Sequence, residues 1–217
     1  MDGEMETGRI EAFSDGVFAI AITLLVLEVR VPHLENAPTG TTLLGALINL
    51  WPSYLGYVMS FLIIGIIWAN HHNRFKYIKR SDHLLLLLNT LFLMCVSFIP
   101  FPTALLAEYL REPEKRQTAV AVYSGTLTLT SIFFNWLWLY AAHNHRLVDK
   151  NLNPRLLKAM TKHFLIGPLL YLISFIFAFI NVTVSLSLYV ILALLYVLPE
   201  PSTRSYKEQP HRQEQES

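Results

Sequence analysis

The chain has 217 residues, of which 53% are hydrophobic and only 15% are charged, and its formal net charge at pH 7 is +1. A soluble domain usually contains about a quarter charged residues, so this composition argues against one large soluble domain. The near-neutral charge argues against a nucleic-acid partner, and the single cysteine, Cys95, excludes an internal disulfide framework. Long uncharged runs are typical of a protein that crosses the membrane several times.

The first apolar run covers residues 13–29 and is expected to be a membrane helix. Residues 1–6, which precede it, are acidic and therefore unlike the basic start of a cleavable signal peptide. A second apolar stretch begins at Leu43. Pro52 is expected to separate a short interfacial piece from the second span proper, residues 53–69.

The third expected span, residues 84–106, is interrupted by Pro100 and Pro102, and the fourth covers residues 119–142. An uncharged run then extends over residues 164–199. As a single helix this run measures roughly 54 Å, well beyond the ~30 Å hydrocarbon layer. Two spans joined by a tight turn at residues 181–183 fit better. The sequence thus predicts an all-α, polytopic domain of six membrane helices over residues 1–199, followed by a polar cytoplasmic tail at residues 200–217.

The loop charges predict the orientation of these spans. With six spans, the two termini and the second and fourth loops lie on one side, and this side carries most of the Lys and Arg residues: Arg9, Arg74, Lys76, Lys79, Arg80, Arg146, Lys150, Arg155, Lys158, Lys162, Arg204, Lys207 and Arg212. The other side carries Arg30, Arg111, Lys115 and Arg116. Because positive residues concentrate in cytoplasmic loops, both termini are expected in the cytoplasm.

The first span carries unusual polar residues and divides into two faces. On a helical wheel Ile20, Leu24 and Leu27 stack on one face, at i, i+4, i+7 spacing, and Thr23 borders them. Ser14 and Asp15 point well away from this stack. Ionisable residues in a span are costly and are candidates for a function, so the pattern indicates an aliphatic face and a polar face with separate roles.

Simpler explanations exist for each of these residues. Ile and Leu occur at helical spacing in any membrane helix. Asp15 lies near a helix N-terminus, where the macrodipole favours a carboxylate, and it can equally be a structural tie between helices. Thr23 can bond back to a carbonyl oxygen one turn earlier.

Several strings resemble one known family. They are Arg9-x-x-x-Phe13-Ser14-Asp15-Gly16, Trp68-x-x-His71-His72-x-x-Phe75, Asn89, and Phe98-Ile-Pro-Phe-Pro-Thr103. In order and in span count they resemble the endosomal and lysosomal potassium channel family (transmembrane protein 175), in particular its prokaryotic six-span branch. The likeness is most specific in the first half of the chain, and the last three spans add little beyond hydropathy.

The resemblance implies a homotetramer in which the first helix of each copy lines a central pore for potassium ions. It places the pore constriction at Ile20, Leu24 and Leu27, and a selectivity ring of hydroxyls at Thr23. It also implies a polar network between helices, formed by Arg9, Phe13, Ser14 and Asp15, with His71 and Asn89 as partners. The expected setting is the lipid bilayer of a prokaryotic plasma membrane, with no cofactor.

Rival functions remain open at this point. A proton-coupled transporter would use Asp15 and His71 as a relay. A membrane redox enzyme would ligate haem or metal through His71 and His72, His143 and His145, or His163, although adjacent histidines point about 100° apart on a helix. A scaffold without transport is the third rival. The sequence contains no hydrolase triad, phosphate loop or dinucleotide fingerprint in a usable context, so an enzyme is not expected.

Overall fold

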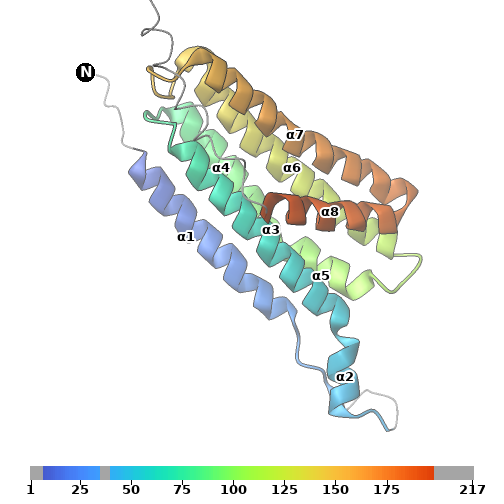
Figure 1. Ribbon diagram of the computed structural model, residues 1–217. Coiled ribbons are helices and arrows are strands. Elements are labelled where there is room, and N and C mark those ends of the chain that lie inside the picture. Colours follow the sequence, from blue (N-terminus) through green and yellow to red (C-terminus); the bar gives the residue numbers. More distant parts are fainter. Residues whose placement is uncertain (1–6, 35–39, 198–217) are drawn as a thin grey trace, which may run out of the picture.

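The computed structural model describes residues 7–34 and 40–197, and this part of the chain is helical apart from its connections (Figure 1). The helices are α1 (Gly8–Leu24, continued by a 3₁₀ turn over Leu25–Glu28), α2 (Leu43–Asn49), α3 (Trp51–Phe75), α4 (His83–Phe98), α5 (Pro100–Tyr109), α6 (Arg116–Ala142), α7 (Pro154–Ile180) and α8 (Val182–Val197). The expected all-α class is confirmed. The predicted tail at residues 200–217 lies outside the described residues.

Five stretches of the described chain are long and apolar enough to cross a membrane: Gly8–Glu28, Trp51–Phe75, His83–Tyr109, Arg116–His145 and Pro154–Ile180. They correspond to the first five expected spans. The sixth expected span corresponds to the apolar helix α8, which the structure describes up to Val197, where the described residues end. In Figure 1 α8 turns back from the end of α7 and crosses the bundle obliquely.

Prolines set two of the helix boundaries. Pro52 occupies the first turn of α3, just after the short α2, which matches the expected break between an interfacial piece and the span. Pro100 begins α5 immediately after α4, so the third span is made of two consecutive helices. The described turn between α7 and α8 lies at Asn181, whose backbone is extended.

Several helices extend further than the hydropathy of the sequence indicates. The helix α3 continues six residues beyond the expected end of its span, and α7 begins at Pro154, ten residues before the uncharged run. Asn153 caps α7 by accepting a hydrogen bond from the backbone N–H of Arg155. These extensions carry polar residues. A helix can continue beyond its apolar segment into the headgroup region, so hydropathy alone underestimates its length.

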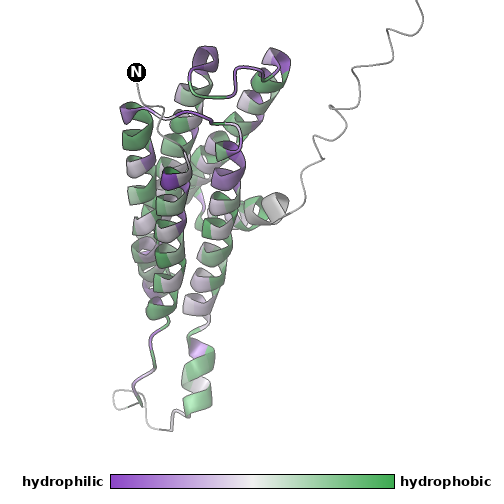
Figure 2. Ribbon diagram, turned by 90° about the vertical axis from the view of Figure 1, so that its left-hand side faces the viewer, coloured by the Kyte–Doolittle hydropathy of each residue, from purple (hydrophilic) through white to green (hydrophobic). Residues whose placement is uncertain are grey.

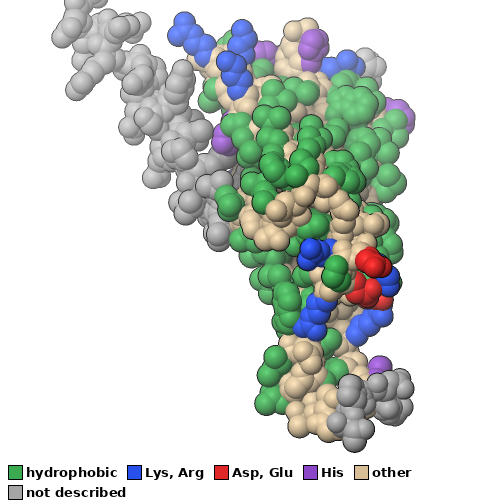
Figure 3. Space-filling view, turned by 90° about the vertical axis from the view of Figure 1, so that its right-hand side faces the viewer, with side chains coloured by type: hydrophobic (Ala, Val, Ile, Leu, Met, Phe, Trp, Pro, Cys, Tyr) green, Lys and Arg blue, Asp and Glu red, His purple; other side chains and the backbone are tan. Residues whose placement is uncertain are grey.

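Hydropathy divides the bundle along its length. Hydrophobic residues predominate along the helices, and hydrophilic residues are concentrated at the end opposite α2 (Figure 2). Figure 3 shows a broad apolar band with Lys, Arg and His at one end and mixed charges at the other. This band is the surface that a bilayer covers. The end that carries α2 is called the α2 end below.

The packing places α1 at an edge of the bundle. One half of α1 contacts α3 and α4, while α6 packs between α4 and α7. Phe18, Ala21 and Leu25 of α1 are fully buried in the main hydrophobic core with Ile64 and Phe92. No other described helix packs against the opposite half of α1, and this arrangement positions the candidate site.

Candidate pore helix and its polar anchor

An aliphatic stripe occupies the free half of α1. The residues expected to form the constriction are exposed within the protomer, Ile20 by 61%, Leu24 by 41% and Leu27 by 68%. Phe13, seven residues before Ile20, is exposed by 61% and lies on the same side of the helix. We call Phe13, Ile20, Leu24 and Leu27 the front stripe. Side chains that are exposed on a membrane helix of one protomer face lipid, a second copy or a pore lumen.

Thr23 borders the front stripe and is exposed. Its Oγ1 donates to the carbonyl oxygens of Ala19 (3.0 Å) and Ile20 (2.9 Å), so the bond back to the preceding turn is present. A hydroxyl has one proton and two lone pairs. Because the proton is directed at the helix's own carbonyl groups, the oxygen presents lone pairs on its open side.

The back of α1 is tied to two other helices by a buried chain of hydrogen bonds. The His71 Nε2 atom of α3 lies 3.0 Å from Asn89 Oδ1 of α4, and Asn89 Nδ2 donates to Ser14 Oγ at 3.0 Å. Ser14 Oγ donates in turn to the carbonyl oxygen of Ile10 at 2.8 Å. All three polar side chains are buried. The structure thus brings together Ser14, Asn89 and His71, which we call the back network.

Aromatic rings enclose His71. Its ring stacks on Phe75 at a centroid distance of 4.4 Å and on Phe92 at 5.6 Å, and the edge of Phe18 approaches at 5.6 Å. The bond to Asn89 is the polar contact that orients this ring in apolar surroundings. His72, the next residue, is exposed and lies 3.9 Å from Glu11. The two adjacent histidines therefore point in different directions.

The remaining residues of the expected network lie elsewhere. Asp15 is exposed within the protomer and accepts a 2.8 Å hydrogen bond from Trp68 Nε1. Arg9 is exposed at the start of α1, and Phe13 belongs to the front stripe. The Asp15–Trp68 bond ties α1 to α3 beside the back network, but Asp15 and His71 have separate hydrogen-bond partners.

The position of Arg74 in the structure differs from the position that the sequence predicts. The charge pattern predicts a cytoplasmic loop position, whereas the structure buries Arg74 near the end of α3. Its Nη1 donates to the carbonyl oxygen of Phe134 at 2.7 Å, and its guanidinium lies 3.6 Å from the Phe134 ring centroid and 4.2 Å from that of Phe164. These contacts join α3 to α6 and α7 through cation–π stacking.

A surface clamp holds the loops at the end opposite α2. Asp82 caps α4 by accepting from Leu85 N (2.9 Å), and its other oxygen accepts from Tyr140 Oη (2.6 Å) and lies 3.4 Å from Arg146 Nη2. Partial burial alone raises the pKa of Asp82. The two hydrogen bonds and the Arg146 charge outweigh that effect, so the pKa of this carboxyl lies below its ordinary value.

The structure also bears on the metal-binding rival. Within residues 7–34 and 40–197, no three His, Cys, Asp or Glu side chains gather as a metal site. His145 lies 3.0 Å from the carbonyl oxygen of Leu152, and His143 lies 3.2 Å from Asn144. Both form local loop contacts.

Comparison with known proteins identifies relatives over almost the whole chain. The family described as endosomal/lysosomal potassium channel TMEM175 matches residues 9–100. A potassium channel of Chamaesiphon minutus is 48% identical over 195 residues, covering 90% of this chain and 95% of the relative. A potassium channel of Streptomyces collinus is 45% identical over 191 residues, covering 88% and 91%. The crystal structure of a lysosomal potassium-selective channel TMEM175 homolog from Chamaesiphon minutus superposes with a TM-score of 0.78 at 46% identity, covering 88% of this chain and 96% of that one.

Proposed function

Because this chain belongs to the TMEM175 channel family, we propose that it is a potassium-permeable cation channel whose pore is lined by α1 of several copies. The relatives are ion channels rather than enzymes. The observation that supports a pore along α1 is the front stripe, which is exposed in the protomer while the back of the same helix is tightly packed. The expected assembly is a homotetramer with α1 at its axis.

The front stripe supplies a hydrophobic gate in this proposal. Ile20, Leu24 and Leu27 of each copy meet around the axis and form three successive rings of branched side chains. A narrow apolar constriction excludes water and so blocks ions that keep their hydration shell. Opening requires the α1 helices to spread or rotate, and the rigid back of α1 allows the helix to move as one body with its neighbours.

Thr23 supplies the selectivity of the same pore. Its proton is used within the helix, so its oxygen lone pairs are available to a passing cation. A ring of such oxygens replaces part of the water that an ion loses. K+ loses water at a lower free-energy cost than Na+, so K+ is favoured, though less strongly than by a filter of many carbonyl groups.

The back network holds the pore helix in register. Ser14, Asn89 and His71 come from three different helices, and their hydrogen bonds fix the orientation of α1 relative to α3 and α4. We further propose that the protein lies in the plasma membrane of a prokaryote. In this orientation the basic loops at the end opposite α2 and both termini are cytoplasmic.

The gate and the selectivity are tested by recording from the purified protein in bilayers. A reversal potential under bi-ionic K+/Na+ conditions is expected to show preference for K+. Ile20→Asn and Leu24→Ala are expected to raise basal K+ flux at least tenfold, because a polar or smaller ring stays wet. Leu169→Ala, at an exposed position of α7, is the matched control and should leave flux unchanged. Unchanged flux in both front-stripe variants contradicts the hydrophobic gate.

A further inference from the structure

A regular apolar stripe runs along the exposed side of the third span. It consists of Leu84, Leu87, Leu91, Met94, Phe98 and Phe101, all exposed, at alternating spacings of three and four residues. This alternation keeps one seam of a helix continuously facing a partner helix. The described residues of the protomer leave this stripe uncovered.

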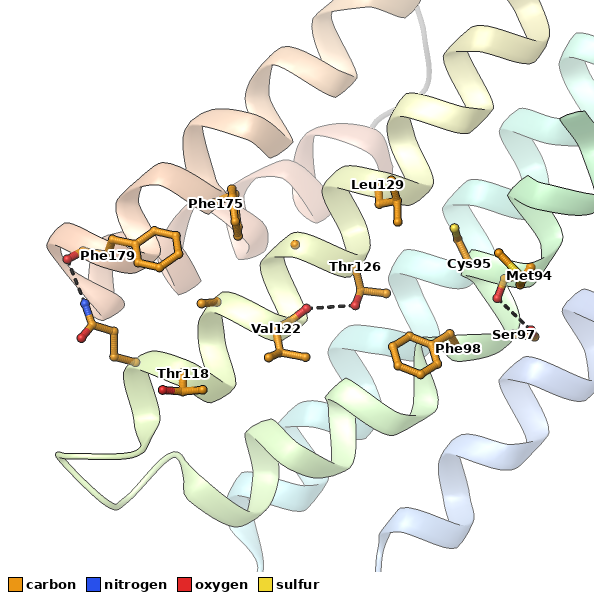
Figure 4. A pocket seen from close by; sticks show the side chains of 13 residues that line it. Met94, Cys95, Ser97, Phe98, Thr118, Val122, Thr126, Leu129, Phe175 and Phe179 are labelled. Atoms are coloured by element: carbon orange, nitrogen blue, oxygen red, sulfur yellow. Dashed lines mark hydrogen bonds between the residues drawn. The ribbon is translucent and has the colours of Figure 1, made fainter.

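A groove of about 870 Å³ lies beside this stripe near the α2 end, between α4, α6 and α7 (Figure 4). Its floor is the side of α6 that carries Val122 and four small residues, namely Thr118, Ala121, Gly125 and Thr126. Bulky side chains form the walls, with Met94 and Phe98 on one side and Phe175 and Phe179 on the other. Small residues on a membrane helix allow another helix to approach closely.

Three of the polar side chains that line the groove donate hydrogen bonds to backbone carbonyl oxygens. Thr126 Oγ1 donates to the carbonyl oxygen of Val122 at 2.9 Å, and Ser97 Oγ to that of Met94 at 2.9 Å. Gln117 Nε2 donates to the carbonyl oxygen of Phe179 at 2.9 Å. The groove thus offers mainly shape and apolar contact to its occupant.

A complementary ridge lies on a different side of the protomer. The first turns of α3 expose Tyr54, Leu55, Val58, Phe61 and Leu62, which are bulky and apolar or aromatic. The helix α3 packs against α1, α5 and α8, whereas α4, α6 and α7 form the groove. Since α3 and α6 both begin at the α2 end (Figure 1), the ridge and the groove lie at the same depth in the membrane.

We propose that the α3 ridge of one copy docks into the α4–α6–α7 groove of the next copy. This inference rests on the proposed function, in which α1 faces a common axis. Because α1 packs on α3 and α4, those two helices flank it as the two sides of a wedge. When the α3 side of one copy contacts the α4 side of the next copy, the contact is head-to-tail. Repeated from copy to copy, it closes into a ring with the α1 helices at its centre.

Disulfide trapping in membranes tests this contact. In a Cys95→Ala background, the double variants Val58→Cys with Phe98→Cys and Val58→Cys with Val122→Cys are oxidised with copper phenanthroline and run on a denaturing gel. The proposal predicts a ladder of cross-linked species up to the full ring with at least one pair. The single-cysteine variants are expected to stay monomeric on the gel. Dimers from a single-cysteine Phe98→Cys variant indicate a two-fold contact and overturn the head-to-tail arrangement.

A groove-filling variant provides the second measurement. Val122→Trp places a large ring in the groove and is expected to lower the native mass in detergent from the assembly to the single chain, whereas Ile176→Trp, at an exposed position of α7, should keep the assembly. If the unmodified protein has the mass of one chain, the proposed channel assembly fails. If it is assembled but gives no cross-linked ladder and tolerates Val122→Trp, a lipid or another surface fills the groove and this inference alone is overturned.

Discussion

The two sides of α1 differ in burial and in hydrogen bonding to other helices. On the back, Ser14, Phe18, Ala21 and Leu25 are buried, and Ser14 accepts a hydrogen bond from another helix. On the front, Ile20 and Leu27 are more than half exposed, and Thr23 bonds only to carbonyl groups of its own helix. Packing of the protomer thus accounts for the residues of the back, while the described residues leave much of the front uncovered.

This difference separates stability from conduction. Substitutions on the back should lower the stability of the protomer, because they leave buried polar groups without partners. Substitutions on the front should leave protomer stability nearly unchanged and alter ion flow. Stability below is the free energy of unfolding in mixed micelles.

The largest loss of stability is expected for Asn89→Leu. The amide joins His71 to Ser14 through two buried hydrogen bonds, and its loss leaves a ring nitrogen and a hydroxyl without these partners. At about 1–3 kcal/mol for each buried group, the expected cost is about 3 kcal/mol. Thr90→Val is the matched control on the same helix, since the Thr90 hydroxyl is exposed and bonds to the Leu86 carbonyl oxygen. If both variants lose the same amount of stability, the expected difference between buried and exposed polar groups is contradicted.

A smaller loss is expected for Ser14→Ala. This variant removes the acceptor for Asn89 Nδ2, and the amide group keeps its contact with His71. The expected cost is about 1–2 kcal/mol. Denaturation measurements on this variant and on a control from the front stripe, Ile20→Ala, compare the two losses of stability. A larger cost at Ile20 would mean that the front is packed within the protomer.

Asp82 gives a pH-dependent reference at the membrane surface. Its pKa is lower in the folded protein than in the unfolded chain, so its contribution is present above the unfolded value near 4 and is lost as pH falls through the folded value. Because the carboxyl side chain is 32% exposed, Asp82→Asn should cost only about 0.5–1 kcal/mol at pH 7. The difference from the unmodified protein should shrink in denaturation curves below about pH 4. A difference that grows on acidification would contradict the assigned contacts.

Thr23→Val should have the smallest effect on stability. The hydroxyl bonds back to its own helix, and such bonds contribute little to helix stability, so the change should be within about 0.5 kcal/mol. The reversal potential under bi-ionic conditions should nevertheless shift towards equal permeability for K+ and Na+. If the variant is stable and its selectivity is unchanged, the Thr23 hydroxyl only bonds to its own helix and does not contribute to selectivity.

Hydropathy and periodicity predict much of this architecture from the sequence. The helical wheel separates Ser14 from Ile20, Leu24 and Leu27, and the structure places them on opposite sides of α1. The same spacing also places Phe13 with Ile20, although the motif groups it with its polar neighbours. The burial of Arg74 is not visible in the sequence, because its aromatic partners, Phe134 and Phe164, come from distant helices.

Cysteine accessibility along α1 tests the account most directly. In a Cys95→Ala background, Ile20→Cys, Leu24→Cys and Leu27→Cys are compared with Phe18→Cys and Ala21→Cys while a small cationic methanethiosulfonate reagent is applied to conducting channels. The account predicts block of the K+ current at the three front positions and no change at the two back positions. Block at the back positions, or no block at any front position, would contradict a pore lined by α1.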